Sequence, residues 1–253
     1  MKIDVITLFP GLVDQIREYG VVGRAIRDSR VSLTMTNPRE FSDDLGGRVD
    51  DRPYGGGPGM VMQFSPLKKA LNHILNQWGV NRDRVKTIYL SPQGRSLSQK
   101  SVRDFGQLQY LVLICGRYEG IDERFIETCV DEEWSIGDYV ISGGELGAMV
   151  LIDAMIRTLP GVLGDEESAQ QDSFEHDLLD CPHYTRPENI EGQKVPQELL
   201  SGDHAVIARW RVKQALGRTY IRRPDLINKH VLSRQEQDLL NEYLAERKIE
   251  KEP

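Results

Sequence analysis

Apolar, β-branched runs alternate with helical patterns through the first two-thirds of the chain. Such alternation is typical of an α/β domain built around a largely parallel sheet. We expect five strands, and their predicted positions are residues 2–8, 31–36, 87–90, 111–115 and 139–141.

The sequence predicts two helices from the residues at their ends and from the spacing of their apolar positions. The first should follow Ser65 as N-cap, with Pro66 at the first helical position and Gly79 just past its end. The second, over residues 145–158, has apolar side chains on nearly all sides. A helix of that kind is buried, either in a core or in a subunit contact.

The composition changes after residue 160. Residues 161–177 hold six acids and no lysine or arginine, and we interpret them as a flexible linker. The sequence therefore predicts three parts: an α/β domain over 1–160, the linker over 161–177, and a small helical domain over 178–253. Within the last part, Asp203 should cap a helix that ends near Gly217, and Ser233 with Glu236 forms a capping box.

The composition, with 39% apolar and 28% charged residues in a chain of 253, fits a soluble globular protein. The longest apolar run, 110–115, is too short to span a bilayer, so no membrane partner is expected. Asp4 interrupts the place where a signal peptide would need an apolar stretch. Three cysteines without a CxxC pattern suit a reducing compartment, and we expect a cytoplasmic location.

The net charge of -7 hides a basic segment over residues 204–224, which contains no acid. Its cations are interleaved with Trp210 and Tyr220, a combination that can contact phosphates and stack on bases. A solvated helix face would show the same pattern, so both interpretations stay open here. The predicted RNA-binding residues are Arg209, Arg211, Lys213, Arg218, Arg222 and Arg223.

Turn-rich segments follow three of the predicted strands, at residues 91–94, 116–120 and 142–145, and a glycine-rich stretch covers 54–59. Ligands of open α/β sheets bind beyond the carboxyl ends of the strands, although each segment could also be an ordinary turn. The chain has no P-loop, no dinucleotide fingerprint, no paired-histidine metal motif and no nucleophile elbow. Phosphate cradling, a histidine-bound metal and covalent catalysis are therefore not expected.

Several long strings in the chain resemble those of bacterial tRNA (guanine-N1)-methyltransferases. They cover residues 49–60, 89–95, 115–124, 133–146 and 179–187, and two short strings lie at 172–174 and 222–224. The resemblance extends over essentially the whole chain. It departs from the family pattern at Gly147, where proline is common, and at 44–47, where a more basic stretch is usual.

The resemblance implies an enzyme that transfers a methyl group from S-adenosylmethionine to N1 of guanine 37 in tRNA. It also implies a SPOUT-type α/β fold with a C-terminal trefoil knot, a small helical C-terminal domain, and a homodimer with a shared active site. The implied cofactor-binding residues are Tyr89, Leu90, Ser91, Pro92, Gln93, Gly94, Gly116, Tyr118, Glu119, Ser135, Ile136, Gly137, Asp138, Tyr139, Val140, Ile141, Ser142, Gly143 and Gly144.

The resemblance assigns two catalytic residues. Asp172 would be the general base that removes the N1 proton, and Arg157 would stabilise negative charge at guanine O6. Without the resemblance, Asp172 would be a solvated linker acid and Arg157 a cation favoured by the end of its helix. Magnesium is associated with the family, but no protein ligands for it can be assigned from this sequence.

Two other functions are compatible with parts of the pattern. A non-catalytic RNA-binding module would need the basic segment and no cofactor. A small-molecule methyltransferase or hydrolase could use the same α/β scaffold, and tRNA would then not protect residues 204–224 from proteolysis.

Overall fold

The structure, a computed structural model, describes residues 1–164 and 171–249. The chain divides into two compact units, Met1–Gly164 and Asp165–Pro253. The boundary falls inside the segment predicted to be the linker. The acidic residues at 165–167, which belong to the predicted linker, lie outside the described residues.

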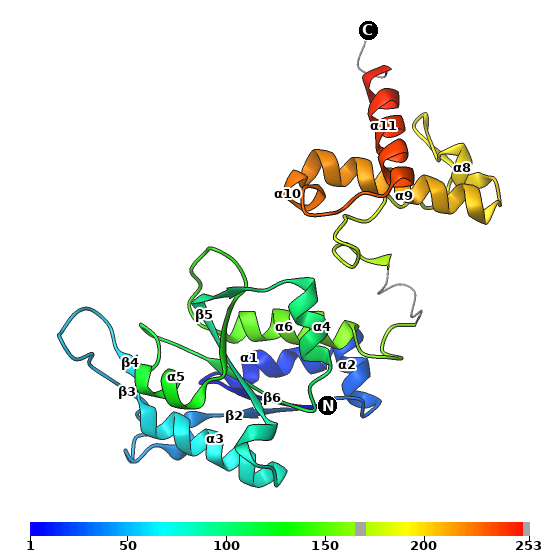
Figure 1. The fold of residues 1–253 in the computed structure, drawn as a ribbon. Coiled ribbons are helices and arrows are strands. Elements are labelled where there is room, and N and C mark those ends of the chain that lie inside the picture. Colours follow the sequence, from blue (N-terminus) through cyan, green and yellow to red (C-terminus); the bar gives the residue numbers. More distant parts are fainter. Residues whose placement is uncertain (165–170, 250–253) are drawn as a thin grey trace. The chain divides into compact units, whose positions relative to one another are not determined.

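A five-stranded sheet with the order β2-β1-β6-β5-β7 forms the centre of the first unit (Figure 1). Every neighbouring pair of strands is parallel. This confirms the α/β class with a parallel central sheet. The strands are β1 (Lys2–Ile6), β2 (Ser32–Thr36), β5 (Lys86–Ser96), β6 (Tyr110–Cys115) and β7 (Glu132–Ser135).

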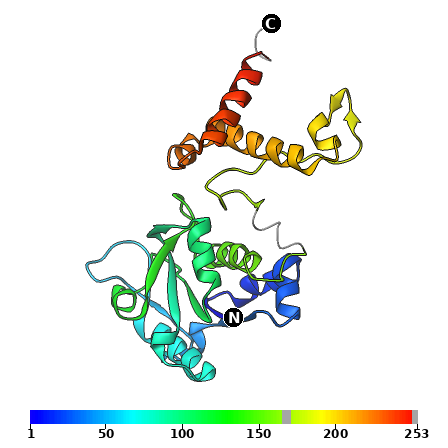
Figure 2. The ribbon, with the colours of Figure 1, turned by 45° about the vertical axis from the view of Figure 1, so that its right-hand side comes forward.

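Helices cover both faces of this sheet (Figures 1 and 2). One buried apolar cluster joins one face to α1 (Pro10–Asp14), α2 (Gly20–Arg27), α4 (Gln99–Gly106) and α6 (Glu145–Arg157). A second cluster joins the other face to α3 (Phe64–Trp78) and α5 (Glu123–Cys129). Shorter elements complete the unit: β3 (Asp50–Asp51), β4 (Val61–Met62), and the 3-10 helices η1 (Gln15–Arg17), η2 (Pro38–Phe41) and η3 (Arg82–Arg84).

The strand predicted at 139–141 is wrong. The fifth strand is β7, which pairs with β5 through Leu90 and Trp134. Its Glu-Glu-Trp-Ser sequence lacks the apolar run that was used to find the others, and Trp134 supplies most of its burial. Residues 139–141 instead lie exposed, with Val140 at 87% relative exposure.

The helix α3 begins two residues earlier than predicted, at Phe64. Gln63 is its N-cap, and Ser65 makes no capping bond because its hydroxyl donates to Asp43 at 3.3 Å. The predicted end is confirmed, since Gly79 adopts the left-handed conformation with φ of 65°.

The predicted burial of α6 is confirmed on most of its circumference. Residues such as Leu151, Ile152 and Met155 are fully buried in the first cluster. Leu146 and Val150, however, are about half exposed, so the helix keeps one apolar stripe at the surface of the unit.

The second unit is mostly helical. Its elements are β8 (Asn189–Ile190), β9 (Gln193–Lys194), α8 (Gln197–Leu200), α9 (His204–Arg222), α10 (Pro224–Ile227) and α11 (Arg234–Ile249). Asp203 caps α9 by accepting from the amide of Ala205 at 2.8 Å, and the capping box of Ser233 and Glu236 is present. These two predictions are confirmed.

The predicted end of α9 near Gly217 is wrong, because the helix continues to Arg222. Gly217 serves packing rather than termination: a Cβ at this position would overlap the ring of Tyr243 on α11. The two helices therefore approach closely, and Leu216, Leu239 and Leu240 form the small core between them.

All three cysteines are free and buried. Among the described residues, none of the helices has the length and apolar character needed to cross a bilayer.

Candidate functional site

A pocket opens where the parallel strands of the first unit end. It has a cavity volume of about 250 Å³, and its walls are residues of β5, the end of β7 and the segments that follow β6 and β7. The turn predicted at 91–94 is therefore wrong, because these residues continue β5. The lining comprises residues 89–92, 116–120, 134–137 and 139–144, together with Gly147. Three segments far apart in sequence thus form one concave surface, at the edge of the sheet where α/β proteins bind ligands.

Most of the predicted cofactor residues line this pocket, but Gln93, Gly94 and Asp138 do not. The sequence did not single out Arg117 and Trp134, which do line it. Arg117 lies inside the predicted turn at 116–120, and this position could have identified it as a lining residue. Trp134 was missed because β7 itself was missed.

Glycines allow the pocket segments to approach one another. Gly144 donates its amide to the carbonyl of Gly116 at 3.1 Å, and a Cβ at Gly144 would lie 2.8 Å from the Cα of Cys115. A Cβ at Gly116 would lie 2.7 Å from the hydroxyl of Tyr89. Larger residues at these positions would force the walls apart.

Two buried ionisable groups lie at this end of the sheet: Tyr89, which lines the pocket, and Cys115, the last residue of β6, which does not. Burial raises the pKa of Tyr89 to about 12, so its phenol remains protonated and can donate a hydrogen bond. Burial also raises the pKa of the Cys115 thiol well above its ordinary value. A thiol held in this way is a poor nucleophile, in keeping with the expectation of no covalent catalysis.

The glycine-rich stretch at 54–59 does not line the pocket, but its last residue lies beside Glu119. The Glu119 amide donates to the carbonyl of Met60 at 2.9 Å. Gly59, with φ of 79°, leaves room for the Glu119 side chain, which a Cβ would overlap. Glu119 itself is exposed and lines the pocket, where it offers a carboxylate to a ligand.

Asp172 lies in a hydrogen-bonded turn of the second unit. Its carbonyl accepts from the amide of Glu175 at 3.3 Å. The neighbouring hydroxyl of Ser173 accepts from the amide of Asp180, and the amide of Leu179 donates to the Thr219 hydroxyl of α9 at 2.8 Å. The turn is therefore attached to α9 rather than standing alone in a linker.

Arg157 is the last residue of α6 and is partly buried in the first unit. It lies in the final turn of the helix, where a cation is favoured by the helix dipole. The two predicted catalytic residues thus belong to different units, and each is described within its own unit.

The basic residues of α9 occupy two sides of the helix. Arg211, Arg218 and Arg222 are seven and four residues apart, which places them within about 40° of one another at 3.6 residues per turn. We call these three the arginine stripe. Arg211 and Arg222 are exposed and Arg218 is partly buried, and none of the three forms an ion pair with another described residue.

The remaining cations of the segment are held by acids. Lys213 is 4% exposed, and its ammonium lies 2.8 Å from Glu246 and 3.2 Å from Glu242 on α11. Arg209 pairs with the same Glu242 at 2.5 Å. The Arg209 guanidinium, together with Lys213, lowers the pKa of Glu242 to about 2. This side of α9 therefore packs against α11.

Arg223 follows the end of α9 and pairs with Asp225 at 2.8 Å. Its guanidinium also lies 5.8 Å from the ring centre of Phe174, in the turn that carries Asp172. Arg223 therefore helps to hold that turn against the second unit.

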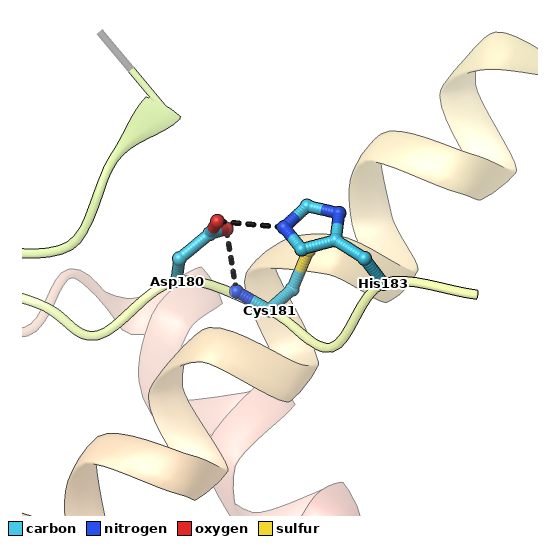
Figure 3. Close-up of side chains that lie close together, drawn as sticks. All are labelled: Asp180, Cys181 and His183. Carbon is cyan, nitrogen blue, oxygen red and sulfur yellow. Dashed lines mark hydrogen bonds and ion pairs between the residues drawn. The ribbon is translucent and has the colours of Figure 1, made fainter. Parts of the chain in front are cut away.

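One group of potential metal ligands occurs among the described residues, formed by Asp180, Cys181 and His183 (Figure 3). Their ligand atoms lie within 4.8 Å of one another, but Nε2 of His183 already contacts Asp180 at 2.8 Å. Burial, together with the neighbouring Asp180, raises the pKa of the Cys181 thiol to about 11. Magnesium prefers oxygen ligands, so a set with one sulfur and one imidazole does not fit it.

The parallel sheet and the glycine-lined pocket at its carboxyl ends define an α/β protein with a candidate site for a small ligand at the strand ends. Comparison with known proteins identifies the family: residues 1–229 match the model of tRNA (Guanine-1)-methyltransferase TrmD. The chain belongs to this family of tRNA-modifying transferases.

Curated relatives extend the match over almost the full chain. The tRNA (guanine-N(1)-)-methyltransferase of Pseudomonas syringae pv. tomato is 58% identical over 98% of both chains. That of Pseudomonas putida (strain W619) is 57% identical over the same shares. The protein of the same name from Nitrosococcus oceani is 56% identical over 99% of this chain and 98% of its own length.

Proposed function

We propose that this protein transfers a methyl group from S-adenosylmethionine to N1 of guanine 37 in tRNA, next to the anticodon. The observation that carries the proposal is the pocket at the strand ends, in a chain that belongs to a family named for guanine-N1 methylation of tRNA. Its glycine-lined walls suit an extended cofactor held by backbone groups, with Glu119 available for the amine end.

S-adenosylmethionine supplies a methyl group on a sulfonium, so that transfer breaks the carbon–sulfur bond, forms the N1–carbon bond and leaves a neutral thioether. Guanine N1 must lose its proton in the same process. The carboxylate of Asp172 accepts that proton, and Arg157 donates hydrogen bonds to O6 as negative charge develops there. Positioning of the two reactants supplies much of the remaining acceleration.

The target base must leave its stack before it can enter a pocket. We propose that the arginine stripe of α9 contacts the phosphates of the anticodon arm, while Lys213 acts only in packing. The exposure of Arg211 and Arg222 and the burial of Lys213 support this division. The proposal therefore names fewer RNA-binding residues than the sequence predicted.

The resemblance also implies finer structural features, which we include in the proposal. Residues of β5 and the segments after β6 and β7 gather at the pocket, and this is where we place the trefoil knot. A second copy of the chain would cover the exposed apolar stripe of Leu146 and Val150 and complete the active site. A tRNA substrate would place the enzyme in the cytoplasm.

A methyl-transfer assay tests the proposed function. With labelled S-adenosylmethionine, we expect transfer to tRNA with guanine at position 37 and essentially none to the same tRNA with adenine there. Binding of tRNA without any transfer would instead favour the non-catalytic RNA-binding module. Transfer to a small molecule but not to tRNA would favour the third alternative.

The salt dependence of tRNA binding tests the division of α9. Replacing Arg222 with Gln should reduce the slope of log affinity against log salt by about 1, since one phosphate contact is lost. Lys213→Met should leave the slope unchanged and lower the thermal stability of the second unit, because Glu242 and Glu246 lose their buried partner. Binding titrations at several salt concentrations measure both slopes. The reverse pattern, with Lys213 changing the slope and Arg222 not, would contradict the assignment.

A further inference from the structure

A buried ion pair lies behind the wall of the pocket. Arg117 follows β6 and Glu145 begins α6, and the guanidinium Nη2 lies 2.8 Å from Oε2 of Glu145. The hydroxyl of Thr7 donates to the other carboxylate oxygen at 2.8 Å. Glu145 is only 1% exposed, so its charge interacts with Arg117 under little screening by water.

Arg117 connects two walls of the pocket. Its Nη1 donates to the carbonyl of Ser142 at 3.1 Å, and its guanidinium stacks on the ring of Phe9 with 4.4 Å to the centroid. A Cβ at Gly143 would overlap this side chain. The residue thus holds the segment after β6 against the segment that leads into α6, and both segments line the cavity.

The pair also sets the charge of the pocket. Among the residues that the structure describes, two charged side chains line the cavity, Arg117 and Glu119. With Glu145 directly behind Arg117, the region has one cation and two anions and is net negative. Without the Glu145 charge, the charges of Arg117 and Glu119 would balance, and the region would be neutral.

We propose that Glu145 is a positioning residue that makes the pocket prefer the sulfonium donor over the neutral product. S-adenosylmethionine carries a positive sulfur that S-adenosylhomocysteine lacks, so a net negative region favours the donor by charge alone. Once the methyl group has left, that attraction is lost and the product is released more readily. This inference rests on the proposed function, because it requires the pocket to hold the methyl donor.

Calorimetric binding of the two ligands to the full chain tests the inference. In Glu145→Gln, the affinity for S-adenosylmethionine should fall by on the order of tenfold more than the affinity for S-adenosylhomocysteine. In steady-state assays, the KM for the donor should rise while the KM for tRNA stays unchanged. A purely structural role of Glu145 would weaken both ligands equally and would overturn the inference.

Two further variants separate charge from shape. Arg117→Gln should change the ratio of the two affinities in the opposite direction, toward the donor, and the double variant Arg117→Gln/Glu145→Gln should restore the wild-type ratio. Thr7→Val removes a hydrogen bond to Glu145 but no charge, and should lower thermal stability without changing the ratio. If Glu145→Gln does not fold, the ratio in Arg117→Gln decides, and an unchanged ratio there refutes the charge effect.

The outcomes distinguish this inference from the function on which it rests. If the wild-type chain binds neither ligand, the proposed function fails and the inference with it. If the wild-type chain binds both and the ratio is unchanged in the charge variants, only the inference fails.

Discussion

Asp172→Asn should lose nearly all methyl transfer while it still binds S-adenosylmethionine. The amide has almost the same shape as the carboxylate but cannot accept the N1 proton of guanine. Removal of a general base typically costs about 10²–10⁴-fold in rate. Because Asp172 belongs to the second unit and the pocket to the first, the donor affinity should stay at the wild-type value.

The measurement is single-turnover transfer to tRNA, combined with calorimetry for the donor. Asp177→Asn is a matched control: it makes the same chemical change in the same segment, at an exposed position whose left-handed backbone asparagine tolerates. The control should transfer at the wild-type rate. Full activity of Asp172→Asn would remove Asp172 from the catalytic role, and equal losses in both variants would indicate a disturbed segment instead.

Gly94→Ala should abolish donor binding and destabilise the first unit, although Gly94 does not line the pocket. The added methyl group would overlap the backbone of Glu133 and Trp134 in β7. Backbone atoms cannot rotate away, so β7 must move from β5, and the pocket segments that follow these two strands must separate. Overpacking of this kind typically costs about 1–3 kcal/mol.

Thermal unfolding and calorimetry with S-adenosylmethionine measure the two effects. Gly11→Ala provides the control, since a Cβ at Gly11 meets nothing within 4 Å. It should keep donor binding and wild-type stability. Unchanged donor affinity in Gly94→Ala would mean that the spacing of β5 and β7 does not determine the pocket.

The sequence predicted those elements whose residues carry their own local signal. Four strands have apolar runs and lie where expected, except that β5 continues to Ser96 through the residues predicted as a turn at 91–94. Strand β7 has two glutamates and gains its place by pairing with β5, which is a long-range contact that periodicity cannot reveal. For the same reason the end of α9 was misplaced, because Gly217 acts through its neighbour Tyr243 rather than through its own backbone preference.

The candidate site divides in a similar way. Glycine-rich turns after strands pointed to the pocket, because the edge of a parallel sheet collects such turns. The ion pairs of Arg117, Glu145 and Lys213 could not be predicted, because the partners in each pair are distant in sequence. In the basic segment, residue type alone could not separate Lys213, which packs on α11, from Arg222, which is exposed.

The hydrogen bond from Leu179 to Thr219 ties the Asp172 turn to the helix that carries the arginine stripe. Under the proposed function, the proton acceptor Asp172 and the arginine stripe that contacts the anticodon arm therefore move together as parts of one unit. In such an enzyme, the general base reaches the target nucleotide only when the arginine stripe also binds the RNA.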